Sequence, residues 1–116
     1  MTATSRRNLA EALLGEDPGA ARTELAAALA VFRRLEPEGW RVADGESLLG
    51  EVLWRLGDGE KAGPLLEGSY RRLQELRGDE VGVTRQALAR LRSFRESADQ
   101  DLDSTSYQAE AESSNP

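Results

Sequence analysis

The chain has 116 residues and a formal net charge of −6, and it contains neither Cys nor His. This length suits one small domain with one modest core. The two missing residue types exclude disulfides, thiolate or imidazole metal ligands and every nucleophile–His catalytic arrangement. Ala, Leu, Glu and Arg dominate, Ile is absent and aromatic residues make up only 5%. Because the common residues are good helix formers, the composition predicts an all-α fold.

The negative charge is concentrated at the C-terminal end of the chain. Of the 21 acidic residues, five lie in 98–116, where there is no Lys or Arg, and the other 16 stand against 15 basic residues in 1–97. We therefore expect 99–116 to be a disordered acidic tail. The rest of the chain is nearly neutral, which argues against general electrostatic binding to nucleic acid.

Apolar periodicity and helix-start residues predict helical segments in chain order. Ser5, Asp17 and Asp79 are the expected N-caps of the first, second and fifth segments, and Pro18 suits the first turn of the second. Trp40 is expected to fold over the helix ends as a hydrophobic plug. The segments are expected at about 5–15, 18–35, 41–56, 60–77 and 81–98.

Small residues recur at regular intervals in the stretch 48–70. Gly50, Gly57, Ala62 and Ser69 are separated by seven, five and seven positions, a spacing that lets two antiparallel helices approach closely. A shift of 41 positions places small and apolar residues of the fourth segment on those of the second: Ala62, Leu66, Ser69, Leu73 and Leu76 on Ala21, Leu25, Ala28, Phe32 and Leu35. A period of this size is typical of stacked helical repeats.

The same stretch carries a family resemblance. Its small and large residues match the tetratricopeptide repeat (TPR) motif at Leu49-Gly50, Leu53, Gly57, Ala62, Leu66 and Ser69. The chain therefore resembles TPR proteins over about 17–98, in the longer variety found in kinesin light chain and in the C-terminal regions of some bacterial Ser/Thr protein kinases. The resemblance implies a short right-handed superhelix of antiparallel helix pairs, about 5–35 and 41–77, with a capping helix at about 81–98. The domain is thus expected to cover 1–98.

In arrays of this kind the first helix of each pair lines a concave groove. Opposite the expected buried face of 41–56, one continuous stripe forms the groove candidates for a bound partner: Asp44, Ser47, Glu51, Trp54 and Arg55. An exposed Trp54 would be a good anchor for a peptide. Two alternatives remain: the polar stripe is a solvated face, and Trp54 packs under the first segment or Trp40.

The charges of the stripe bear on the kind of peptide. TPR domains that bind a terminal carboxylate use Lys and Asn where this chain has Ser47 and Glu51, so we expect no carboxylate clamp. A basic or mixed peptide fits Asp44 and Glu51 better. On the fifth segment, Arg85, Arg92 and Arg95, with Arg90 on another face, either contact phosphate or only solubilise the helix. The second interpretation is the simpler one.

We expect no enzyme, because no acid, base or nucleophile set converges in the pattern and no Gly-rich phosphate loop follows a strand. The leading hypothesis is a non-catalytic protein–protein interaction module, a scaffold that binds a peptide or partner protein through the helical groove. The alternative is a structural or self-association segment of a larger multidomain bacterial signalling protein. No cofactor, nucleic acid or membrane partner is expected, and a homo-oligomer is possible. Since Met1–Leu14 has no continuous apolar core, neither a signal peptide nor a membrane span is expected, which favours the cytoplasm.

Overall fold

The computed structural model describes the backbone of residues 1–113 and the side chains of residues 1–99. It consists of helices α1 (Ala3–Leu13), α2 (Pro18–Leu35), α3 (Trp40–Arg55), α4 (Gly59–Arg77) and α5 (Gly82–Ser113). No strand occurs within 1–113. The expected all-α fold is confirmed.

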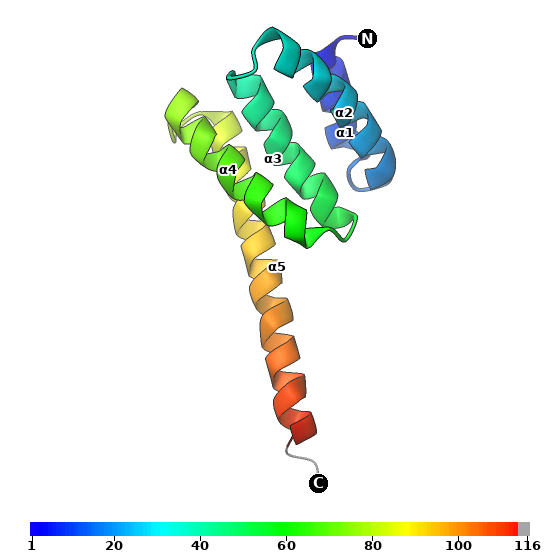
Figure 1. Ribbon diagram of the computed structural model, residues 1–116, viewed down its shortest axis with the longest axis vertical. Helices are drawn as coiled ribbons and strands as arrows, with labels where there is room; N and C mark the ends of the chain where they lie inside the picture. Colours follow the sequence, from blue (N-terminus) through cyan, green and yellow to red (C-terminus); the bar gives the residue numbers. More distant parts are fainter. Residues whose placement is uncertain (114–116) are drawn as a thin grey trace.

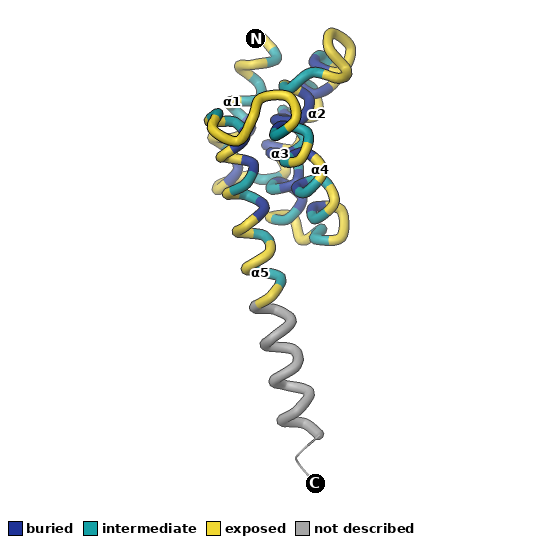
Figure 2. Tube along the Cα trace, turned by 90° about the vertical axis from the view of Figure 1, so that its left-hand side faces the viewer, coloured by how far each residue is buried: buried dark blue, intermediate teal, exposed yellow. Residues whose placement is uncertain are grey.

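Helix α3 is the centre of the arrangement. The most extensive contacts join α3 to α4 and α1 to α2, and α3 also packs against α2 and α5 (Figure 1). Buried positions gather along the inner sides of these helices, while the connecting turns are exposed (Figure 2). Helix α3 is therefore the element against which the other helices pack.

The core has two main halves that meet on α3. One half joins α1, α2 and α3 through Ala10, Leu25 and Leu48, and the other joins α3, α4 and α5 through residues such as Leu66 and Leu91. All five are at most 3% exposed. Full burial of a Leu side chain contributes about 1.5–3 kcal/mol, so these contacts dominate the packing between the helices.

Glycines on α3 allow its two neighbours to approach closely. A Cβ at Gly45 would lie 2.5 Å from Leu29 Cδ2 of α2, and one at Gly50 would lie 2.7 Å from Leu66 Cγ of α4. These distances are shorter than normal van der Waals contacts between carbons, so each site requires a glycine in this packing. The role expected for Gly50 in close helix packing is confirmed.

The helix starts agree with the sequence in one case and differ in two. Asp17 caps α2, since its Oδ1 accepts from Ala20 N at 3.0 Å. The expected cap Ser5 is wrong, because α1 begins at Ala3 and Thr2 Oγ1 accepts from Ser5 N at 3.0 Å. Asp79 does not cap α5 either: its Oδ1 accepts from Gln74 Nε2 at 2.8 Å, and the helix begins only at Gly82.

Helix α5 is longer than the expected segment 81–98. Its bounds are Gly82–Ser113, and the sequence after Ala98 contains no Gly or Pro before Ser113 that would stop a helix. The predicted disordered acidic tail falls largely on residues whose side chains, or for 114–116 whose backbone, lie outside the described part. It stays a prediction.

Candidate functional site

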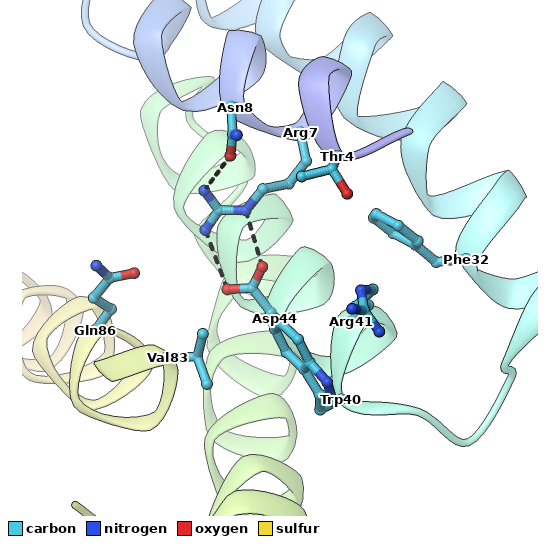
Figure 3. A pocket seen from close by; sticks show the side chains of 9 residues that line it. All are labelled: Thr4, Arg7, Asn8, Phe32, Trp40, Arg41, Asp44, Val83 and Gln86. Atoms are coloured by element: carbon cyan, nitrogen blue, oxygen red, sulfur yellow. Dashed lines mark hydrogen bonds and ion pairs between the residues drawn. The ribbon is translucent and has the colours of Figure 1, made fainter. Parts of the chain in front are cut away.

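A hollow of about 290 Å³ opens where four helices meet, and we call it the Asp44 hollow (Figure 3). Helices α1 and α3 form most of its wall, α2 contributes one aromatic ring, and α5 closes the remaining side. Its lining combines apolar side chains with charged and amide groups. The lining residues are Thr4, Arg7, Asn8, Phe32, Trp40, Arg41, Asp44, Val83 and Gln86.

A bidentate ion pair forms one wall of this hollow. Arg7 Nε donates to Asp44 Oδ2 at 2.9 Å, and Arg7 Nη2 donates to Asp44 Oδ1 at 3.1 Å (Figure 3). Burial by itself lowers the pKa of Arg7, but the hydrogen bond and charge of Asp44, with those of Glu11, outweigh it and raise the pKa above its usual value. The guanidinium is therefore charged at any physiological pH, and the pair fixes α1 against α3.

A second arginine joins α5 to the middle of the stripe on α3. Arg90 Nη1 donates to Ser47 Oγ at 3.1 Å, and its guanidinium lies 3.3 Å from a carboxylate oxygen of Glu51. It also lies 3.6 Å from Glu11 of α1, which in turn pairs with Arg7. One network of alternating charges thus links α1, α3 and α5.

These contacts overturn the interpretation of the stripe as a solvated face. Asp44 is only 5% exposed and Ser47 is fully buried, because α1 and α5 cover this side of α3 with Arg7 and Arg90. The two covering arginines are 37 and 43 positions away from their partners along the chain. No local pattern in the sequence marks them, although Arg90 was expected to lie on a different face from its neighbours.

Trp54 and Arg55 lie at the other end of the stripe. The Trp54 ring is half-buried and meets Phe94 of α5 edge to face, with centroids 5.7 Å apart. Its partner is therefore neither α1 nor Trp40. A second hollow of about 540 Å³ opens beside this pair, lined by Trp54, Gly57, Gly59, Glu60, Phe94, Ser97 and Ala98; we call it the Trp54 hollow. Arg55 is exposed and lies 3.6 Å from Glu51.

Trp40 begins α3 and is one of the residues that line the Asp44 hollow. It packs against a core cluster that includes Leu73 and Ala87, in partial agreement with the expected plug. The guanidinium carbons of Arg41 and Arg77 lie 4.7 and 4.9 Å from its ring centroid. Both are cation–π distances, so two positive charges gather around one ring.

The exposed arginines of α5 do not come together in a binding site. Arg85, Arg92 and Arg95 are all exposed; Arg85 pairs with Glu80 at 2.5 Å, and Arg95 lies 3.8 Å from Glu67. Exposed pairs of this kind contribute little to stability or to binding. They agree best with a solubilising role.

In the part of the chain that the structure describes, no group of His, Cys, Asp or Glu residues is placed to hold a metal ion. Over the same residues, no helix is both long and apolar enough to cross a membrane. None of the protein-family models, curated proteins or solved structures compared with this chain matches it. Fold and site together define a small all-helical domain with a mixed apolar and charged hollow at a four-helix junction.

Proposed function

We propose that this chain is a non-catalytic protein-interaction module, built from TPR-like helix pairs, and that a segment of its partner binds in the Asp44 hollow. The observation that carries this proposal is the make-up of the hollow. Phe32, Trp40 and Val83 offer apolar contact, while Asn8 and Gln86 offer amide groups. Binding sites combine a mainly apolar wall with a few polar groups that fix orientation, and this hollow has both.

The rigidity of the wall also favours binding. The Arg7–Asp44 pair and the Arg90 network lock α1 and α5 onto α3 before any partner arrives. A preorganised site loses less side-chain entropy when it binds, so more of the contact energy remains as affinity. In this proposal Ser47 and Glu51 position Arg90, while Trp54 and Arg55 are left to contact a longer partner.

The helix packing supports the TPR-like part of the proposal. Consecutive helices α1 and α2, and likewise α3 and α4, pack against each other over a large surface. The motif residues Ala62, Leu66 and Ser69 of α4 are buried, and Gly50 makes the close approach that the motif requires. These features are those of a helix pair in a repeat array.

Selection of short random peptides displayed on phage, with the full chain as bait, tests this function. Peptides that are enriched on the chain are then titrated by calorimetry against two tryptophan variants. Thr4→Trp fills the Asp44 hollow, whereas Thr23→Trp places the same bulk on an exposed position of α2 outside it. We expect the first change to weaken binding by at least about tenfold, equivalent to about 1.4 kcal/mol. We expect the second to leave it unchanged.

Two outcomes would refute the proposal. In the first, no peptide is enriched above a control without bait. In the second, Thr4→Trp and Thr23→Trp bind the selected peptides equally well, which would place the contact elsewhere on the domain.

One observation favours the alternative of a self-associating segment. Leu35 is 69% exposed and Leu76 is 45% exposed, and the two leucines occupy equivalent positions under the 41-residue shift. Exposed large apolar residues at repeated positions are candidates for a contact between copies. Light scattering on size exclusion decides between the two: a dimer that dissociates in Leu35→Ser/Leu76→Ser supports self-association, and a monomer argues against it.

A further inference from the structure

Of the charged groups that line the Asp44 hollow, some have an ion-pair partner among the described residues and one does not. Both carboxylate oxygens of Asp44 accept hydrogen bonds from Arg7, at 2.9 and 3.1 Å. The remaining Arg7 nitrogen donates to Asn8 and Glu11. The charge of Asp44 is thus balanced by Arg7, which weakens the attraction of this carboxylate for a basic side chain.

Arg41, at the rim of the same hollow, is in the opposite situation. It is exposed, and no carboxylate of the described residues lies within 4.0 Å of its guanidinium. Glu36 lines an adjacent small hollow together with Arg41 but forms no ion pair with it, and Glu38 is held by Arg72 at 2.9 Å. The guanidinium of Arg77 also lies 4.9 Å from the Trp40 ring centroid, so positive charge is in excess around this ring.

The Phe32 ring lies beside this charge, and neutral amide groups line the other side of the hollow (Figure 3). Asn8 Oδ1 accepts from Arg7 at 3.4 Å, which leaves the Asn8 amide N–H groups to donate to a ligand. Gln86 of α5 faces the same hollow and supplies a second amide (Figure 3). Phe32 and Val83 provide apolar contact for methylene groups. The volume of about 290 Å³ suits one or two side chains.

We propose that the Asp44 hollow binds an Asp or Glu side chain of the partner peptide. Its carboxylate meets the guanidinium of Arg41, and its methylene groups pack against Phe32. This inference rests on the proposed function and adds the chemistry of the peptide to it. It reverses the expectation of a basic or mixed peptide, because Arg7 and Arg90 already neutralise the carboxylates on which that expectation depended.

The test repeats the peptide selection on three forms of the full chain: wild type, Arg41→Gln and Arg34→Gln. Arg34 is the matched control, an exposed arginine of α2 that lies outside the hollow. We expect acidic residues to be enriched at one peptide position on wild type and on Arg34→Gln, and not on Arg41→Gln. Circular dichroism checks that each exposed substitution leaves the fold intact.

Calorimetry on the best peptide then measures the contact itself. Replacing its conserved acidic residue by the corresponding amide is expected to weaken binding to wild type about fivefold, in the range of a partly exposed charge pair. For Arg41→Gln the same replacement changes binding less than about twofold, because the partner charge has been removed.

The outcomes separate the two proposals. Enrichment of basic or uncharged residues, or an acidic preference that survives in Arg41→Gln, overturns the acidic-peptide inference and leaves the binding function standing. Absence of any enriched peptide on all three forms overturns the binding function, and this inference with it.

Discussion

The substitution Gly50→Ala tests the close packing of α3 on α4. The added Cβ would lie 2.7 and 2.9 Å from Leu66 Cγ and Cδ2 and 3.4 Å from the carbonyl oxygen of Ala62. Leu66 is fully buried, so it cannot swing away into solvent. Overpacking of this kind costs about 1–3 kcal/mol. The change from Gly to Ala inside a helix recovers about 1 kcal/mol, so we expect a net loss of up to about 2 kcal/mol.

Gly68→Ala is the matched control on α4. Gly68 is exposed, and a Cβ there would meet no atom within 4 Å, so only the gain in helix propensity remains. Urea unfolding followed by circular dichroism should show Gly50→Ala less stable than Gly68→Ala, with the two free energies of unfolding about 1–3 kcal/mol apart. If Gly50→Ala stabilises the chain as much as Gly68→Ala does, the close approach of α3 and α4 is wrong.

Three further predictions concern the ion pair, the turn and the aromatic contact. Arg7→Leu leaves the buried Asp44 without a partner and should lower the free energy of unfolding in urea by about 3–5 kcal/mol, and Arg7→Leu/Asp44→Leu should recover most of that loss. Equal losses in the single and the double variant would refute the pairing. Gly57→Ala should cost about 1 kcal/mol, since Gly57 has φ +87° with open space around it, and an unchanged midpoint would contradict that backbone conformation. Trp54→Ala removes the contact with Phe94 and should lower the free energy of unfolding by about 2 kcal/mol, less than the loss of a fully buried Trp would. The mass by light scattering should stay unchanged, and a lower mass would show that the Trp54 hollow joins two copies.

The elements were predictable from the sequence where the signals are local. Asp17-Pro18 marks the start of α2 and the periodic apolar residues run to Leu35, and both bounds agree with the structure. The spacing of small residues in 48–70 also predicted a close approach of two helices, which the structure shows at Gly50. Thr2 and Ser5 both carry a hydroxyl that can cap a helix, and the apolar pattern alone did not distinguish between them.

The site was less predictable, because its chemistry depends on contacts between distant segments. The stripe on α3 is polar, as the sequence shows, but the polar groups of Asp44 and Ser47 are satisfied by Arg7 and Arg90 and not by water. The Asp44 hollow needs side chains from four helices. Arg41, which we propose as the charge that selects the peptide, has no feature in the sequence that sets it apart from the other arginines.

The two tryptophans give a direct test of the central claim that the partner binds in the Asp44 hollow. Trp40 lines this hollow and Trp54 lines the other, so their indole N–H signals report on the two ends of α3 separately. In a nitrogen–proton correlation spectrum of the labelled chain titrated with a selected peptide, we expect the Trp40 indole and the side-chain amides of Asn8 and Gln86 to shift. The Trp54 signal should stay in place or move less. Shifts confined to Trp54, or no shift at either indole, would contradict binding at the Asp44 hollow.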